Sequence, residues 1–249
     1  MMKMLKSGHL LNRIKAMLMK ESLGLGLRPG AHHYRAYVGQ PEDYDLIASS
    51  KFNLLTTLGL RQYHTVLDIG CGSLRIGRLL IPYLNVGNYV GIEPNKWLVD
   101  DGIQREIGQD QIRIKQPQFY FSDSAIDLPS DERFDFAIAI HLQSLRARLG
   151  GAMAHGELRP SEGVRVLAAT FLIGDQDYQN KGRVYPKSIY YRVETMAALA
   201  QKAGLWFFLL DWRHPRQQWA LYAKPKFDAT WFQKKALSWN TWLDFASKR

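Results

Sequence analysis

The sequence predicts an α/β protein with a doubly wound sheet of about seven strands, mostly parallel, whose last strand is antiparallel. Two observations predict this fold. From Thr65 to Ala203, short apolar segments alternate with segments of helical periodicity, and such alternation is typical of a parallel sheet that is covered on both faces. Two apolar segments then follow one another closely near the C-terminus, which favours a strand pair that closes the sheet.

Each element is predicted from its own pattern. Strands are expected at 65–69, 89–93, 118–121, 134–140, 164–171, 205–210 and 218–223, and helices at 41–58, 74–84, 96–107 and 190–203. Pro41 suits the first position of its helix, because acidic Glu42 and Asp43 follow in the first turn. Gly204 suits the end of the 190–203 helix.

Composition excludes several classes of protein. A chain of 249 residues with 46% hydrophobic and 22% charged residues is ordinary for a globular protein. Apolar runs shorter than 18 residues predict no membrane-spanning helix. Cys71 is the single cysteine, which excludes an intrachain disulfide and a cysteine-rich zinc site. It suits a reducing compartment, and we expect a cytoplasmic protein.

The positive charge lies at the two ends. Residues 1–40 carry seven Lys or Arg and one acid, and residues 212–249 carry eight and two, so each end is +6. The middle, 41–211, has 18 basic and 20 acidic residues. We therefore divide the chain into a basic amphipathic N-terminal extension (1–30), a ligand-binding domain (31–225) and a basic, aromatic C-terminal tail (226–249). The nearly neutral middle argues against a nucleic-acid partner.

The two ends leave alternatives open. Residues 1–21 have helical spacing and a basic polar side, which suits a helix packed on the domain, a membrane-surface helix or a mitochondrial-type presequence. The tail has aromatic and basic residues together, which suits a helix folded back on the domain or a peripheral membrane contact. Single-stranded nucleic acid is the third alternative for the tail.

A glycine turn after the first predicted strand points to a ligand site. Asp68 lies near the end of that strand, and Gly70 and Gly72 follow it. Glycines there allow a sharp turn and a close approach of a ligand to the backbone, at the strand edge where open α/β sheets bind ligands. Arg75 stands where a dinucleotide fingerprint needs its third glycine, and a P-loop Gly-Lys-Ser/Thr ending is absent.

Acidic residues after the next two strands indicate an adenosine-type ligand. Glu93 lies 21 residues after Gly72, at the end of the second strand, where a carboxylate can accept hydrogen bonds from both ribose hydroxyls. Asp123 follows the third strand, where a carboxylate can accept from an adenine amino group, although an acid there also suits a helix cap. An adenosine ligand without a pyrophosphate fits this set better than a dinucleotide.

Four short motifs occur in order: Asp68-Ile-Gly70-Cys-Gly72, Gly91-Ile-Glu93-Pro94, Ser122-Asp123 and Phe134-Asp135-Phe136. In this order and spacing they resemble the successive motifs of class I S-adenosylmethionine-dependent methyltransferases, over about residues 60–225. The stretches 33–35, 81–84 and 93–98 also resemble an uncharacterised bacterial subfamily. The resemblance implies a Rossmann-like fold, S-adenosyl-L-methionine as cofactor and a transferase activity.

The resemblance also implies roles for single residues. Asp68, Gly70 and Gly72 would line the methionine part of the cofactor, and Glu93 would hold the ribose. Asp123 and Ser124 would lie at the adenine edge, and Ile140 and His141 beside the sulfonium and the acceptor. We expect methyl transfer to an oxygen or nitrogen of a small-molecule or saccharide acceptor, with His141 as the candidate catalytic base. The alternative is a non-catalytic adenosine-binding or scaffold domain, because the glycine-punctuated segment 143–158 fits the family poorly.

The histidines and Cys71 also have structural interpretations. His141 follows a buried strand and suits a core residue as well as a base. His214 lies in a turn between the last two strands, where we favour a structural role, and His32 and His33 are candidates for a lid over the cofactor. The histidines have no acidic or Cys partners at metal-ligand spacing, so we expect no metal site. Cys71 is expected to be a small buried residue.

Overall fold

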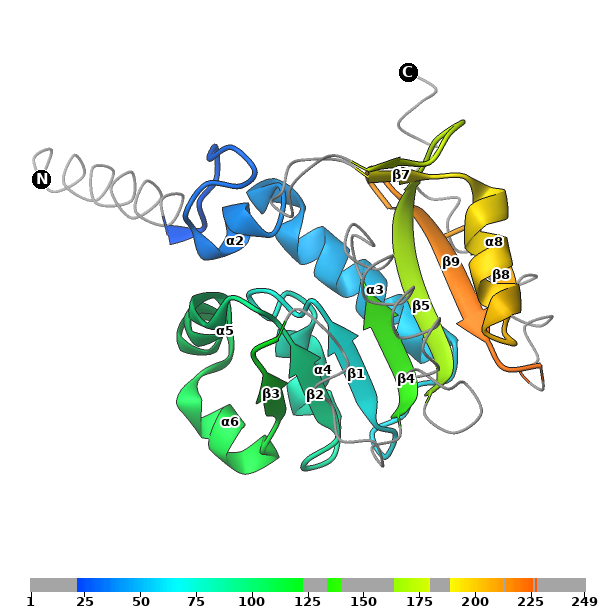
Figure 1. Ribbon diagram of the computed structural model, residues 1–249. Helices are drawn as coiled ribbons and strands as arrows, with labels where there is room; N and C mark the ends of the chain where they lie inside the picture. Colours follow the sequence, from blue (N-terminus) through cyan, green and yellow to red (C-terminus); the bar gives the residue numbers. More distant parts are fainter. Residues whose placement is uncertain are drawn as a thin grey trace, which may run out of the picture.

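The computed structural model describes residues 22–122, 134–139, 164–179, 189–212, 214–225 and 227. Five parallel strands form the centre of its sheet, in the spatial order β3-β2-β1-β4-β5 (Figure 1). They are β1 (Val66–Ile69), β2 (Tyr89–Ile92), β3 (Gln118–Tyr120), β4 (Phe134–Ala139) and β5 (Val164–Ile173). All five lie within one or two residues of the predicted ranges, and the predicted fold class is confirmed.

The predicted strand pair closes the sheet beyond β5. Strand β9 (Gln218–Ala223) runs antiparallel to β5, with Ala168 opposite Leu221, and also antiparallel to β8 (Trp206–Leu210) on its other side. Among these seven strands, β9 alone is antiparallel to the central five, as the sequence predicts. The turn between β8 and β9 therefore lies at the edge where the parallel strands end.

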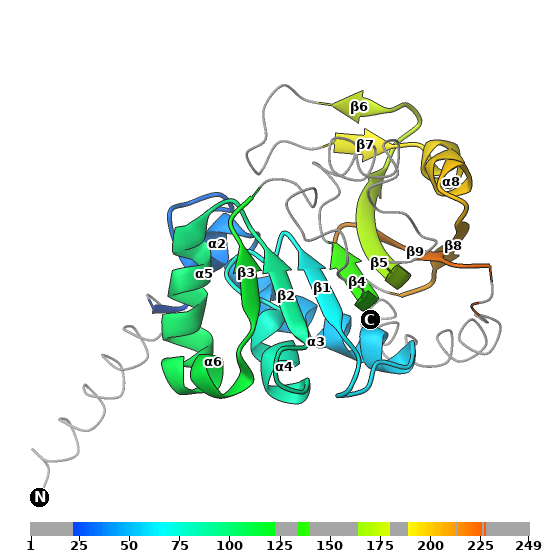
Figure 2. The ribbon, with the colours of Figure 1, turned by 60° about the horizontal axis from the view of Figure 1, so that its bottom comes forward.

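Two short strands were not predicted. Strands β6 (Tyr178–Gln179) and β7 (Ile189–Tyr191) pair with each other, and β7 pairs with the end of β5. This hairpin stands beyond the arrowheads of the central strands (Figure 2). The predicted helix 190–203 is consequently wrong at its start: α8 spans Val193–Lys202. Aromatic residues at 190 and 191 favour a strand, which the helical pattern of the following residues concealed.

The other helices begin and end differently from their predicted ranges. The predicted helix 41–58 is a short 3-10 turn, η1 (Pro41–Asp43), followed by α3 (Tyr44–Thr57). Helix α4 (Gly77–Tyr83) starts later than predicted, and 96–107 divides into α5 (Lys96–Gly102) and a π-helical turn, η2 (Ile103–Ile107). The sequence analysis missed α2 (Tyr34–Tyr37) and α6 (Gln109–Lys115).

The sheet separates two apolar cores. On one face, Leu54 of α3, Leu80 of α4 and Val99 of α5 pack with Val66 and other strand residues. On the other face, Met196 and Ala200 of α8 pack with Leu167 and Phe171 of β5. Because side chains alternate along a strand, Asp68 lies on the same face of β1 as Val66, toward α3 and α4. In Figure 2 these two helices lie behind the sheet.

Several predictions fall outside the described residues. They are the amphipathic helix at 1–21, the segment 143–158 and the tail from 228 onward. Among the described helices, none is long and apolar enough to cross a membrane. The described residues also contain no group of three or more His, Cys, Asp or Glu that could hold a metal ion.

Candidate functional site

The glycine turn after β1 has the left-handed backbone that only glycine adopts readily. Gly70 and Gly72 have φ angles of 72° and 56°, in the left-handed region that favours glycine. A Cβ at Gly72 would lie 2.8 Å from Cγ1 of Val38. Glycine is thus required at position 72 for two reasons: the φ angle is positive, and Val38 leaves no room for a Cβ.

Leu74 has the same left-handed conformation without being a glycine. Its φ angle is 59°, and its side chain is fully buried in the core beside α4. The left-handed conformation costs a non-glycine residue about 1–2 kcal/mol, which the burial of a leucine side chain offsets at about 1.5–3 kcal/mol. This explains how the turn keeps its shape with a leucine at position 74, two residues after Gly72.

Glu93 lies directly against this turn. The backbone N–H of Gly72 donates to Oε2 of Glu93 at 3.1 Å, and the backbone and side-chain N–H groups of Asn95 donate to Oε1 at 3.0 and 2.8 Å. The Glu93 side chain is buried. A carboxylate has about four acceptor positions, so these three donors fix its orientation and leave it able to accept from a ligand. The structure therefore brings together the predicted glycine turn and the predicted ribose acid.

Asp68 occupies a buried polar cluster behind the turn. Its Oδ2 accepts a hydrogen bond from the Tyr89 hydroxyl at 2.8 Å. Burial raises the pKa of Asp68, and the nearby Lys51 ammonium opposes that shift. Burial and the charge of Arg75 lower the pKa of Lys51, and Asp68 opposes this. Lys51 and Asp68 are therefore two buried ionisable groups that influence one another's pKa at the end of β1.

The sequence analysis missed Lys51, although the pattern contains a signal for it. The buried face of α3 consists of Tyr44, Ile47, Ala48, Lys51, Leu54 and Leu55. A lysine within an apolar stripe of helical spacing is unusual, because lysine is almost never fully buried unless it is paired. Only the packing of α3 on the sheet brings this lysine close enough to Asp68 for their charges to interact.

An N-terminal segment covers the glycine turn. Arg75 donates to the backbone carbonyl of Val38, and Val38 contacts Gly72 as described above. His32 stacks on Trp97 of α5 with ring centroids 4.5 Å apart, and Tyr37 meets the same indole edge-on at 5.2 Å. The structure thus brings His32, a predicted lid residue, beside the start of α5, whereas His33 forms the N-terminal cap of α2.

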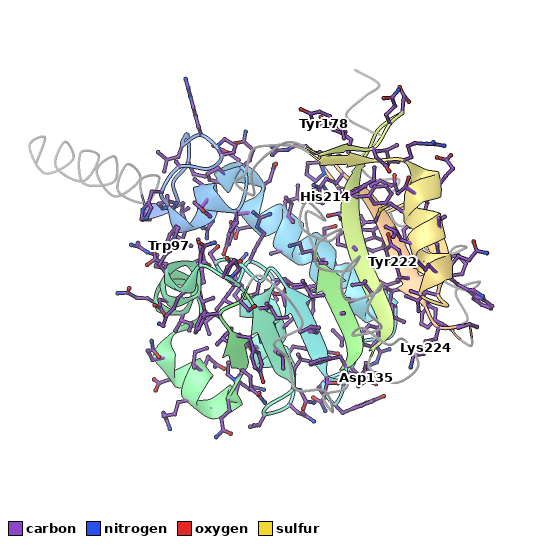
Figure 3. All side chains as sticks on the ribbon, in the orientation of Figure 1. Trp97, Asp135, Tyr178, His214, Tyr222 and Lys224 are labelled. Carbon is purple, nitrogen blue, oxygen red and sulfur yellow. The ribbon has the colours of Figure 1, made fainter. Side chains whose placement is uncertain are left out.

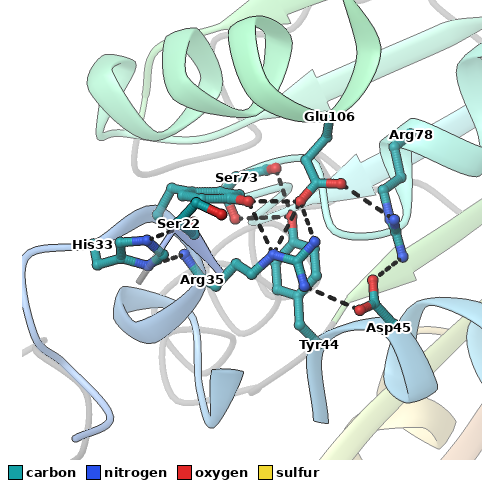
Figure 4. A network of polar contacts seen from close by, with 9 residues as sticks. Ser22, His33, Arg35, Tyr44, Asp45, Ser73, Arg78 and Glu106 are labelled. Atoms are coloured by element: carbon teal, nitrogen blue, oxygen red, sulfur yellow. Dashed lines mark hydrogen bonds and ion pairs between the residues drawn. The ribbon is translucent and has the colours of Figure 1, made fainter. Parts of the chain in front are cut away.

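A network of charges anchors this segment (Figure 4). Arg35 of α2 pairs with Glu106 of η2 at 2.5 Å and with Asp45 of α3 at 3.0 Å. Arg78 of α4 bridges the same two carboxylates at 3.2 and 2.5 Å. The hydroxyl of Tyr44 donates to the backbone carbonyl of Ser73 in the glycine turn at 2.9 Å. Four elements and the turn are therefore held in one arrangement.

The β8–β9 turn lies at the same edge of the sheet. Trp212 donates its indole N–H to the Ser50 hydroxyl at 3.0 Å, and Arg216 pairs with Asp43 at 2.5 Å. Nδ1 of His214 accepts the backbone N–H of Gln217 at 3.1 Å, which places the proton of the neutral ring on Nε2. In Figure 3, His214 and Tyr178 lie toward the carboxyl ends of the strands, and Asp135 and Lys224 lie at the opposite edge.

Asp135 and Cys71 have structural positions. Asp135, from the fourth motif, accepts the backbone N–H of Thr65 at 3.0 Å and joins the starts of β1 and β4. Cys71 is buried as predicted, and burial raises the pKa of its thiol well above the ordinary value. Asp123, Ser124, Ile140 and His141 lie outside the described residues.

Comparisons with known proteins place this arrangement among methyltransferase folds. Magnesium protoporphyrin IX methyltransferase from Synechocystis PCC 6803, solved with bound S-adenosylmethionine, is similar with a TM-score of 0.54 and 16% identity, over 83% of this chain and 89% of that one. The methyltransferase domain of bacterial CtHen1 has a TM-score of 0.52 and 16% identity, over 71% and 97%. DesVI from Streptomyces venezuelae has a TM-score of 0.53 and 12% identity, over 73% and 92%.

The chain therefore has the Rossmann-like fold of class I S-adenosylmethionine-dependent methyltransferases, as the motif resemblance implies. No protein-family model matches the sequence, and a search of curated proteins found no match to it. At 12–16% identity these neighbours establish the fold. They leave the acceptor to be inferred, because one fold supports many functions.

Proposed function

We propose that this protein transfers a methyl group from S-adenosyl-L-methionine to an oxygen or nitrogen of a small-molecule or saccharide acceptor. The observation that supports this most is the hydrogen bond between the Gly72 N–H and Glu93. It joins a glycine turn to a buried carboxylate at the carboxyl ends of β1 and β2, in a fold shared with methyltransferases. The described residues fit an adenosine-type ligand.

The proposed roles of the described residues follow from this geometry. Glu93 accepts hydrogen bonds from the ribose hydroxyls, and the backbone at Gly70 and Gly72 allows the methionine part to approach closely. Asp68 supplies negative charge behind the turn. The proposal also includes Asp123 and Ser124 at the adenine edge, and Ile140 and His141 near the sulfonium.

Methyl transfer requires the protein mainly to align the two reactants. S-adenosylmethionine, when bound, supplies a methyl carbon that is already electrophilic. The protein must hold that carbon and the acceptor atom in line, and such orientation supplies up to roughly 7–11 kcal/mol of barrier reduction. A base such as His141 is required only where the acceptor is a hydroxyl or a protonated amine.

Calorimetric titration with S-adenosylmethionine tests the cofactor. We expect the wild type to bind it, and Glu93→Ala to weaken binding by about 10- to 100-fold, the usual effect of losing hydrogen bonds to a charged group. Glu194→Ala is the matched control, because Glu194 is an exposed carboxylate on α8 that is paired with Arg192. Equal binding by wild type and Glu93→Ala would contradict the ribose role.

Release of S-adenosylhomocysteine in the presence of pooled acceptors tests the activity. Methyl transfer predicts release that depends on an acceptor from the small-molecule or saccharide pools. Cofactor binding without release from any pool would instead favour the non-catalytic adenosine-binding domain.

A further inference from the structure

Lys51 has a buried side chain, and its Nζ forms no hydrogen bond or ion pair with the described residues. Its side chain lies in the buried face of α3, and the residue is 5% exposed. Three influences act on its ammonium: burial, Arg75 and Asp68. A buried ammonium is costly unless it is paired and hydrogen-bonded, so the position calls for a counter-charge and an acceptor.

Lys51 lies on the helix that contacts the glycine turn of the proposed cofactor site. Tyr44 lies two helical turns before Lys51 on the same face of α3 and donates to Ser73 in the glycine turn. Asp68 lies on the α3-facing side of β1, two residues before Gly70 of that turn. The Trp212 indole bonds the neighbouring Ser50. Tyr44 and Ser50 of α3 thus contact the glycine turn and the β8–β9 turn, and Lys51 lies on the buried face of the same helix.

The charges around Lys51 favour an anionic ligand group. Asp68 is the nearby carboxylate, and it also accepts the Tyr89 hydroxyl. Arg75 adds a second cation, which disfavours the charged form of Lys51. Glu93 is held by Gly72 and Asn95, and the proposed function assigns it to the ribose. A ligand carboxylate would give Lys51 both the acceptor and the counter-charge.

We propose that Lys51 binds the α-carboxylate of the amino-acid end of S-adenosylmethionine, with Asp68 as its counter-charge before the cofactor binds. This inference rests on the proposed function, because it assigns a further residue to the same site. Lys51 thereby distinguishes nucleosides that carry an amino acid from those that do not.

Two nucleosides separate this role from a structural one. S-adenosylhomocysteine carries the carboxylate and is unreactive as a methyl donor, whereas 5′-methylthioadenosine lacks the amino acid. By titration of the full chain, Lys51→Met is expected to weaken S-adenosylhomocysteine binding by about 10- to 100-fold. Its affinity for 5′-methylthioadenosine is expected to stay within about 2-fold of wild type. Lys202→Met, at an exposed position near the end of α8, is the control.

A second variant guards against misfolding. Because Lys51→Met leaves Asp68 buried without its cation, Lys51→Met combined with Asp68→Asn is compared with Asp68→Asn alone. The same selective loss is expected in that comparison. Equal losses for both nucleosides, or no loss for either, would overturn the role of Lys51.

The wild-type titrations separate the two proposals. A wild type that binds neither nucleoside overturns the proposed function and this inference together. A wild type that binds S-adenosylhomocysteine, while Lys51→Met keeps the wild-type ratio of affinities, overturns this inference alone.

Proton uptake gives an independent readout. A ligand carboxylate favours the charged form of Lys51, whose pKa is lowered by burial. Calorimetry near pH 8 in two buffers of different ionisation enthalpy should show proton uptake with S-adenosylhomocysteine and none with 5′-methylthioadenosine. Equal uptake for the two ligands would contradict the proposal, since Asp68 and Arg75 face Lys51 in both complexes.

Discussion

Nη2 of Arg35 lies 2.5 Å from Oε1 of Glu106, and both side chains are almost completely buried. The pair joins α2 to the π-helical turn that follows α5, and the Tyr34 hydroxyl donates to the same carboxylate oxygen at 2.8 Å. Removing one partner of a buried ion pair leaves an uncompensated charge, so such pairs are much more sensitive to substitution than surface pairs. The position of α2 over the glycine turn therefore depends on Arg35.

Arg35→Met is expected to lower the free energy of unfolding by about 2–4 kcal/mol, because Glu106 then stays buried with only part of its network. Arg78 still pairs with Glu106 and limits the loss. Urea unfolding measures the change. Arg113→Met is the control, since Arg113 forms an exposed pair with Asp110 that should contribute less than about 1 kcal/mol. Similar losses for the two variants would show that burial does not matter here.

Gly102→Ala is expected to destabilise the protein by about 1–3 kcal/mol, as overpacking does. A Cβ at position 102 would lie 2.4 Å from the backbone oxygen of Ser73. The sign of the stability change is informative, because replacing glycine by alanine within a helix ordinarily stabilises a protein by about 1 kcal/mol. Thermal unfolding tests it, with Gln201→Ala on the exposed side of α8 as control. A gain in stability at position 102 would mean that α5 and the glycine turn are farther apart than described.

Lys51 should make stability depend on pH in the mildly alkaline range. Burial lowers the pKa of Lys51 from 10.5 to about 7. Between these values the unfolded chain binds a proton that the folded chain does not, so stability rises with pH across this window. Urea unfolding between pH 7.5 and 9.5 should show this rise in the wild type. Lys51→Met should show a flatter profile, and parallel profiles would contradict the shift.

The strands were predictable because each depends on a local pattern. Val66–Ile69 and Tyr89–Ile92 are short runs that are buried on both faces, as central parallel strands must be. The hairpin of β6 and β7 was not predictable in the same way. Its strands are two or three residues long and gain their partner only from the end of β5, far away in the sequence.

The candidate site also contains residues that could be predicted from the sequence and residues that could not. Glu93 and the glycines were predictable, because their spacing follows from a strand, a turn and the next strand. Lys51 was not, since only the packing of α3 against the sheet brings it near Asp68. Leu74 is a second residue whose conformation could not be predicted from the sequence. A leucine at this position does not suggest a left-handed backbone, yet the structure has one, with the leucine side chain buried.

Two buried tyrosines should respond in opposite ways to the same substitution. Tyr44 donates its hydroxyl to Ser73 at 2.9 Å, so Tyr44→Phe leaves a buried carbonyl without this donor and should cost about 1–2 kcal/mol. The Tyr222 hydroxyl is buried without a hydrogen-bond partner in the described part of the chain. Tyr222→Phe removes an unsatisfied group, so it should be neutral or stabilise the protein by up to about 1 kcal/mol. Urea unfolding of both variants decides the matter: a loss at Tyr222 as large as that at Tyr44 would mean that the Tyr222 hydroxyl is satisfied in solution.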